Sequence, residues 1–254
     1  MRIFLACSTS ACNKDEREDF FKKNKPLYLL ETFFSGEKTC KKVLELVGNE
    51  NFLLDSGAFS FMSGAKCDKE MLLQYLDRYI EFINKYDVKY FFELDVDTIF
   101  GIEFVEEMRK KLEKETQKQC IPVWHKGRGI DYWKKMCSEY KYVAIGGLVF
   151  HVKKAEWPLI KKMVDYAYAK GVKVHGLGFT KTKLLDEYKF YSVDSSSWLS
   201  SASRGQKLSV FNGRNMQMKD INKGNKKANI TKMAGFNLKE WIKYQKYMDE
   251  KKWR

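Results

Sequence analysis

Short apolar runs alternate with longer amphipathic stretches along most of the chain. In the longer stretches apolar residues recur every three or four positions, which is the period of an α-helix. One helix is predicted to begin at Asp68. Further helices are predicted over Ile102–Lys118, Asp131–Tyr140, Val152–Lys170 and Lys181–Lys189, and from about Asn237 to Lys252. The short runs predict strands at Arg2–Cys7, Leu27–Phe33, Phe52–Asp55, Tyr90–Asp95, Ile121–Trp124, Tyr142–Gly146, Val172–Leu177 and Phe190–Asp194.

Strands that alternate with helices in this way predict an α/β protein, and eight of them predict a (β/α)8 TIM barrel. An open doubly wound sheet shows the same alternation and is the alternative. Its nucleotide-binding forms are disfavoured because no G-x-G-x-x-G follows the first strand and no Walker loop occurs. We expect one domain over residues 1–254, with the barrel over about 1–200 and a basic extension over about 200–254.

Composition narrows the class of protein further. Hydrophobic residues make up 44% of the 254 positions, which excludes a mainly disordered chain. No apolar run approaches the ~18 residues of a membrane helix, and Ile3–Cys7 is too short for a signal peptide. The six cysteines form no C-x-x-C pair and only three histidines occur, so we expect reduced thiols, no metal and no cofactor. These features predict a soluble, cytoplasmic protein.

Positive charge is concentrated at the end of the chain. The net charge is +14, and 14 Lys and Arg stand against four Asp and Glu after residue 200. A polyanionic partner such as nucleic acid explains this imbalance, because cations near phosphates release condensed counterions on binding; high lysine usage for solubility is the alternative. The candidate phosphate contacts, partly in a predicted basic loop over Lys219–Lys232, are Arg204, Arg214, Lys219, Lys223, Lys226 and Lys227.

Carboxylates stand at the ends of three predicted strands. Asp55, Asp95 and Asp194 each follow apolar residues, where charged groups are rare unless they are paired or used. The carboxyl ends of barrel strands converge at one mouth, where active sites are built. A single Asp after a strand is commonly a turn residue. Three of them, together with the glycine-containing ends Gly146-Gly147 and His175-Gly176, favour a functional site.

Two kinds of chemistry suit these carboxylates. One carboxylate can attack an anomeric carbon while a second serves as acid and base, as in glycosyl transfer. Alternatively, Asp95 and Asp97 could hold a magnesium ion, since their alternating spacing permits it. The pair Gly146-Gly147 has no side chains, so a flat ligand could lie against its backbone.

Four short segments carry these residues: LDSGAFS at 54–60, IGGL at 145–148, HGLG at 175–178 and SVDSSSW at 192–198. In order and spacing they resemble segments of the tRNA-guanine transglycosylases, namely D-S-G-G-F-Q, G-G-L-A, M-G-V-G and the strand end that bears the nucleophile. The resemblance covers roughly residues 52–204. It implies a (β/α)8 barrel that exchanges guanine in a nucleic acid for a preformed 7-deazaguanine.

The chain departs from the tRNA enzymes in two respects. Their zinc subdomain, with C-x-C-x-x-C and a later His, is absent, since no cysteine follows Cys137. Val123-Trp124-His125 also replaces their V-Q-G. The variants Ala58, Ser60 and Ser-Ser-Ser-Trp are more similar to the compact phage and bacterial branch of the family. That resemblance implies DNA and a free 7-deazaguanine base as partners, in the cytoplasm of the cell or of a phage host.

The resemblance also implies roles for single residues. Asp194 would be the nucleophile that holds the sugar C1′, Asp55 the general acid and base, and Asp95 the acceptor for the guanine-like edge of the base. Further implied substrate-binding positions are Ser56, Gly57, Phe59, His125, Gly146, Gly147, His175 and Gly176. His175 or Phe59 would pack on the face of the base, although His175 equally suits a hydrogen-bonded histidine at a strand end.

Three other functions compete with this hypothesis. A relative that acts on tRNA would insert labelled base into tRNA but not into duplex DNA. A noncatalytic nucleic-acid-binding barrel would keep its function when Asp55 and Asp194 are replaced by alanine. A barrel hydrolase with a small sugar substrate would have no salt-sensitive affinity for DNA.

Overall fold

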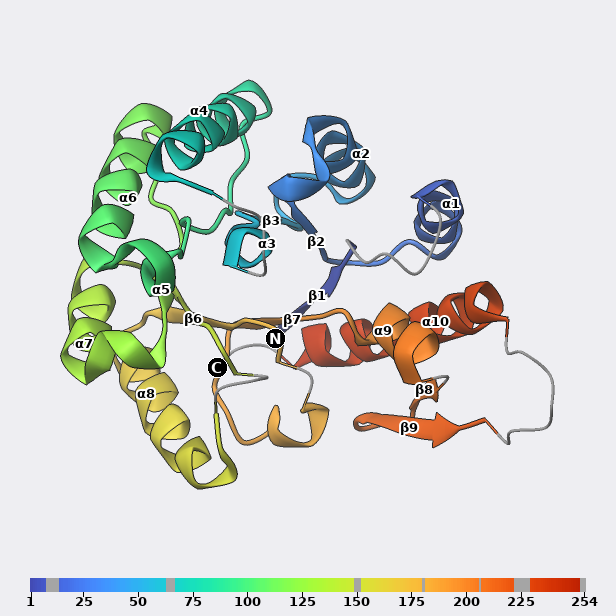
Figure 1. Cartoon of the computed structure of the whole chain (residues 1–254). Helices are drawn as coiled ribbons and strands as arrows, with labels where there is room; N and C mark the ends of the chain where they lie inside the picture. Colours follow the sequence, from blue (N-terminus) through green and yellow to red (C-terminus); the bar gives the residue numbers. More distant parts are fainter. Residues whose placement is uncertain are drawn as a thin grey trace.

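A curled parallel sheet forms the centre of the protein, described here from a computed structural model that places residues 1–7, 14–62, 67–148, 152–179, 181–205, 207–221 and 229–251. Its seven strands lie in the order β3-β2-β1-β7-β6-β5-β4 (Figure 1). The strands are β1 Arg2–Ala6, β2 Leu29–Thr32, β3 Phe52–Asp55, β4 Val123–Trp124, β5 Tyr142–Ile145, β6 Lys173–Gly176 and β7 Ser192–Ser195. The predicted α/β class is confirmed.

The helices are α1 Lys14–Asn24, α2 Glu37–Val47, α3 Ala58–Met62, α4 Lys69–Lys85, α5 Asp97–Phe100, α6 Ile102–Thr116, α7 Gly129–Glu139, α8 Trp157–Ala169, α9 Ser197–Gly205 and α10 Ile230–Glu250. Of these, α2, α4, α6, α7 and α8 lie around the outside of the sheet in Figure 1. The helix predicted over Lys181–Lys189 is wrong, because only a short 3₁₀ turn, Thr182–Leu184, forms there. The Thr182 hydroxyl bonds the backbone of Met216, and such side-chain bonds compete with a helix.

Alternation along the strands divides the core into two parts. In β1, Ile3 and Leu5 pack with the outer helices, whereas Phe4 joins a smaller cluster inside the curl of the sheet. Leu53 of β3 belongs to the same inner cluster. Because successive side chains of a strand point to opposite faces, Asp55 lies on the same face as Leu53. The strand pattern therefore directs Asp55 to the inside of the curl.

The segment 90–93 lies between the two edge strands of the sheet. Leu54 of β3 donates its N–H to the Tyr90 carbonyl oxygen at 3.0 Å and accepts from the N–H of Phe92 at 3.1 Å. On the other side, the N–H of Ile121 donates to the Phe91 carbonyl oxygen at 2.8 Å. The predicted strand Tyr90–Asp95 is thus present as two isolated parallel bridges rather than as a regular strand.

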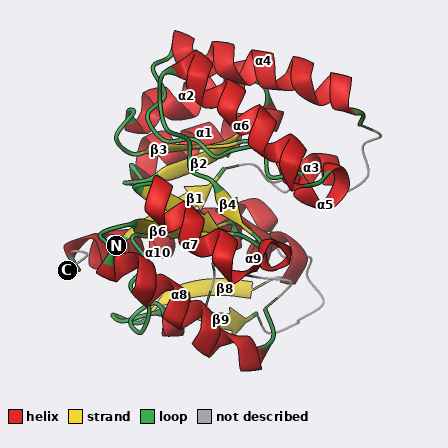
Figure 2. Cartoon of the chain, turned by 90° about the vertical axis from the view of Figure 1, so that its left-hand side faces the viewer, coloured by secondary structure: helices red, strands yellow, loops and turns green. Residues whose placement is uncertain are grey.

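The C-terminal part contains a hairpin that the sequence pattern does not predict. Strands β8 (Lys207–Phe211) and β9 (Met216–Asp220) pair antiparallel, separate from the main sheet, and α10 packs on β8 (Figure 2). The predicted basic loop Lys219–Lys232 is therefore wrong at both of its ends, because β9 includes Lys219 and α10 begins at Ile230. None of the described helices is long and apolar enough to cross a membrane.

Helix α10 is anchored to the sheet by one buried side chain. The Gln245 amide donates to the carbonyl oxygens of Ile3 at 2.7 Å and Tyr28 at 2.8 Å, and its oxygen accepts from the N–H of Leu27 at 3.0 Å. Gln245 thus bonds backbone groups in β1 and just before β2, and the Tyr28 carbonyl oxygen also accepts from the N–H of Leu5 at 3.1 Å. The last described helix is thereby fixed to the first two strands.

Candidate active site

Three carboxylates meet at the carboxyl-terminal edge of the sheet. Asp55 ends β3, Asp194 lies in β7, and Asp95 follows the bridged segment 90–93. Burial, and after it the charge of Asp95, raises the pKa of Asp55 to about 7, with a further contribution from the charge of Asp194. Hydrogen bonds from Thr32 and from the Gly57 N–H oppose this rise. The structure therefore places the two other predicted carboxylates, Asp95 and Asp194, within electrostatic range of Asp55.

Histidine 125 lies between two of the acidic side chains. Its Nε2 is 3.1 Å from Oδ2 of Asp95, and its Nδ1 is 3.1 Å from Oδ1 of Asp97. Burial disfavours the charged ring, but the bonds to Asp95 and Asp97 outweigh burial and raise the pKa of His125 to about 9. The imidazolium donates to both carboxylates at neutral pH, and it occupies the position between them where the magnesium alternative would place a cation.

A buried ion-pair network continues from Asp97. Arg128 reaches Oδ1 of Asp97 at 2.8 Å and Oε1 of Glu93 at 2.7 Å, and Arg109 lies 3.1 Å from Oε2 of Glu93. The side chain of Glu93 is fully buried and that of Arg128 is 1% exposed. Charges of opposite sign thus alternate from Asp95 to Arg109, which compensates the cost of burying each of them. The sequence analysis did not identify this network, although Glu93 stands inside an apolar run.

Asp194 receives two hydrogen bonds on one oxygen. The N–H of Gly178 donates to Oδ1 at 2.6 Å, and Nε2 of His175 lies 3.1 Å from the same atom. His175 is fully buried, with its ring between those of Phe4 and Phe92. Of the two predicted roles of His175, the hydrogen bonds of its ring agree with that of a hydrogen-bonded histidine at a strand end, and the ring has no exposed face in this structure.

At three of the predicted substrate-binding positions, the surrounding atoms or the backbone conformation favour glycine. A Cβ at Gly146 would lie 2.5 Å from Cδ2 of His125, so residue 146 must be glycine for the ring to fit. Gly176 is buried against Leu148 and Phe190. Gly57 has φ +80° and leaves no space for a side chain beside Phe34 and Thr32.

Ser56 is fully buried beside the site. Its hydroxyl accepts weakly from the N–H of Ala58 at 3.4 Å, and its carbonyl oxygen accepts from the Tyr75 hydroxyl at 2.7 Å. Gly147 follows β5 at the same edge with φ +71°. Phe59 lies in α3, and its side chain is outside the described part of the structure.

Of the six predicted phosphate-binding residues, the structure describes the side chains of Arg214 and Lys219. Arg214 is exposed in the hairpin turn, 3.3 Å from Asp186, and Lys219 is exposed on β9. Arg204 belongs to α9, but its side chain is not described. The remaining predicted contacts lie outside the described residues: Lys223, Lys226 and Lys227.

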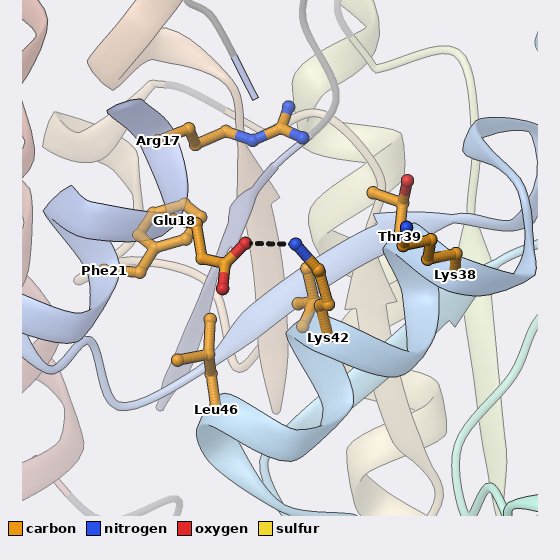
Figure 3. Close-up of a pocket in the computed structure, with 8 residues that line it drawn as sticks. Arg17, Glu18, Phe21, Lys38, Thr39, Lys42 and Leu46 are labelled. Atoms are coloured by element: carbon orange, nitrogen blue, oxygen red, sulfur yellow. Dashed lines mark hydrogen bonds and ion pairs between the residues drawn. The ribbon is translucent and has the colours of Figure 1, made fainter. Parts of the chain in front are cut away.

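A separate groove opens between α1 and α2. It has a volume of about 230 Å³ and contains the ion pair of Glu18 with Lys42, whose oxygen and nitrogen are 2.6 Å apart (Figure 3). The described residues that line it include none of the predicted site residues. The carboxylates and not this groove are therefore the candidate active site.

This arrangement suits acid–base and nucleophilic chemistry. Asp55 can exchange a proton near neutral pH, Asp194 is held with one oxygen anchored, and Asp95 is fixed by a cationic ring. No protein-family model matches the sequence, and comparison with characterised proteins gives no significant match, so the inference of function depends on the geometry of these residues.

Proposed function

We propose that the protein is a DNA-guanine transglycosylase, which replaces guanine in DNA by a free 7-deazaguanine base. The observation that carries the proposal is the carboxyl of Asp55, whose pKa is raised to about 7 by burial and by Asp95, next to the anchored carboxylate of Asp194. A base-exchange enzyme must protonate a leaving base and deprotonate an incoming one at the same pH. A carboxyl group that titrates near neutrality can do both.

The proposed reaction has two displacement steps. Asp194 attacks the sugar C1′, the bond from C1′ to N9 of guanine breaks, and its electron pair leaves with the purine, which takes the proton of Asp55. The 7-deazaguanine then gives its N9 proton to Asp55 and attacks C1′, which releases the Asp194 carboxylate. Protons and charge balance over the cycle, and no cofactor is needed.

Asp95 would hold the base in position. One of its oxygens is bound by the His125 imidazolium at 3.1 Å, so its orientation is fixed before a base binds. An ionised carboxylate only accepts hydrogen bonds, and the guanine edge offers two neighbouring N–H groups. Because Asp95 and Asp97 raise the pKa of His125 to about 9, the His125 ring stays charged around neutral pH and continues to hold Asp95.

We also propose that the sheet closes into a (β/α)8 barrel. Strand β1 pairs with β7, so the first and last strands of the sheet are neighbours. The segment 90–93 hydrogen-bonds to Leu54 of the edge strand β3 and to Ile121, which precedes the other edge strand, β4. This segment would be the eighth strand of the barrel. All neighbours in such a ring follow one another along the chain, as in the barrel fold and unlike a doubly wound sheet.

DNA is the proposed partner because of the resemblance to the compact branch of the family and because of the charge of +14. A target base must leave the stack, at a cost of a few kcal/mol, before it can reach a carboxylate at a barrel mouth. Phosphate contacts from exposed cations such as Lys219 and Arg214 would offset this cost. We place the reaction in the cytoplasm, where DNA and the free base are both present.

The test uses duplex DNA with radiolabelled guanine, the protein and a 7-deazaguanine. We expect label to be released while the strand stays intact and the new base to appear in it, and Asp194→Asn to abolish the release while DNA binding persists. Turnover by Asp194→Asn, or no release from any DNA, would refute the proposal. Release without replacement would indicate a glycosylase, and exchange confined to tRNA would indicate the tRNA-acting relative.

A further inference from the structure

A row of hydrogen-bonded side chains leads through the inside of the sheet to Asp194. Nε2 of His175 lies 3.1 Å from Oδ1 of Asp194, and Nδ1 of the same ring lies 2.6 Å from Oγ of Ser192. The Ser192 hydroxyl is in turn hydrogen-bonded to the hydroxyl of Tyr142. The row therefore connects β5, β6 and β7, and His175 and Ser192 are fully buried.

The chemistry of the partners fixes where the protons of this row lie. The Asp194 carboxylate only accepts, so His175 carries its proton on Nε2. With the proton on Nε2, Nδ1 accepts from the Ser192 hydroxyl at 2.6 Å. Burial raises the pKa of Tyr142, whose hydroxyl keeps its proton and donates to Ser192. Every donor in the row points toward Asp194.

The two oxygens of Asp194 are consequently not equivalent. Both His175 and the N–H of Gly178, at 2.6 Å, donate to Oδ1. Among the described residues, no group donates a hydrogen bond to Oδ2. Two donors draw electron density to Oδ1 and fix the plane of the carboxylate, so Oδ2 retains its lone pairs for a substrate.

We infer that His175, supported by Ser192 and Tyr142, is a positioning residue that presents Oδ2 of Asp194 as the attacking oxygen and makes the carboxylate a better leaving group. This inference rests on the proposed function. In the covalent intermediate, the bond from C1′ goes to Oδ2 and Oδ1 becomes the ester carbonyl. The same two donors then stabilise the negative charge that returns to Asp194 when the incoming base takes over C1′.

Substitution of His175 should therefore slow the second step more than the first. His175→Met removes the donor, and we expect kcat to fall about tenfold to a hundredfold while KM for DNA changes less than twofold. A larger share of the protein should then be trapped as a covalent DNA adduct on a denaturing gel. His175→Gln keeps an N–H near the position of Nε2 and should recover most of kcat.

The supporting hydroxyls provide a matched pair of milder variants. Tyr142→Phe removes the last donor of the row, and we expect a fall in kcat of about twofold to fivefold. Tyr90→Phe is the control, because the Tyr90 ring contacts that of Tyr142, with 6.2 Å between centroids, but its hydroxyl is not part of the row. Equal effects of the two variants, or wild-type kcat in His175→Met, would overturn the inference.

A measurement that needs no turnover separates this inference from the proposed function. The chain has only three histidines, so ¹⁵N NMR can resolve the ring nitrogens of His175 in the unmodified protein. We expect the proton on Nε2 with Nδ1 as an acceptor, and a weakened preference for that tautomer in Ser192→Ala. A proton on Nδ1 or a charged ring would refute the positioning role. The expected tautomer without any base exchange would refute the transglycosylase and leave the arrangement of donors intact.

Discussion

Replacement of Asp55 by asparagine should stabilise the protein, and the gain should grow with pH. The pKa of Asp55 rises from 3.8 to about 7 on folding, because of burial and then the charge of Asp95. The unfolded chain therefore loses this proton at lower pH than the folded protein does, so the free energy of unfolding falls as pH rises from about 4 through about 7. At 1.36 kcal/mol per pH unit, this rise in the pKa of Asp55 lowers the free energy of unfolding by ~4 kcal/mol at pH 8.

Urea denaturation of the wild type and Asp55→Asn at pH 5 and pH 8 measures this effect. We expect the stability difference between the two proteins to increase by ~2.5 kcal/mol from pH 5 to pH 8, because the folded wild type is still protonated at pH 5. Any contribution of asparagine that does not depend on pH cancels in this comparison. A stability difference that is the same at both pH values would refute the assignment of Asp55 as a neutral carboxyl group.

Asp97→Asn is the matched control, because this substitution should lower the stability at pH 8 where Asp55→Asn should raise it. Burial works against the charge of Asp97, but hydrogen bonds from His125 and Arg128 hold its pKa below the usual range. Asp97 therefore stabilises the folded protein above pH 4, and this contribution is lost as the pH falls through and below its ordinary value of 3.8. The variant should be less stable than the wild type at pH 8, with a difference that narrows toward pH 3.

Three further predictions follow from packing, anchoring and charge. Gly146→Ala should lower the free energy of unfolding by ~1–3 kcal/mol because its methyl group would collide with the His125 ring, whereas Gly127→Ala, whose Cβ meets nothing within 4 Å, should have no effect in the same urea titration. Gln245→Ala should lower the free energy of unfolding by ~2–4 kcal/mol, since three hydrogen bonds from this side chain to the backbone are lost; a cost below ~1 kcal/mol would contradict this anchoring role. Lys219→Gln should reduce the slope of log Kd for DNA against log salt by about 1 if this exposed cation contacts a phosphate, and an unchanged slope would remove it from the interface.

The strand pattern was predictable because the buried strands are continuous apolar runs. Phe52–Asp55 has the predicted bounds, and β1 and β5 differ by one residue at one end. Helices α1 and α2 were not assigned from the sequence, and α1 is polar along most of its length. The hairpin β8–β9 was missed because Met216–Asp220 is mostly exposed and lacks an apolar run, and α10 packs on its partner strand β8.

Only those residues of the candidate active site that stand at the ends of strands could be predicted from the sequence. Asp55, Asp95 and Asp194 stand out because each follows apolar residues in the sequence. The partners of Asp97 and Glu93 could not be found in this way, because Arg128 comes from the start of a different helix and reaches both carboxylates only in the folded protein. The sequence left two roles open for His175, because a histidine at a strand end gives no indication of whether its side chain points into the sheet or toward the mouth.

The pairing of β1 with β7 has a consequence for synthesis on the ribosome. Strand β1 finds one neighbour, β2, within about 30 residues, but its other neighbour is translated only when the chain has reached Ser192–Ser195. Until then one side of β1 exposes unpaired backbone groups, an edge on which foreign strands can add. Nascent chains that stall before β7 should therefore depend on chaperones, and release from them should coincide with emergence of the last stretch of the sheet.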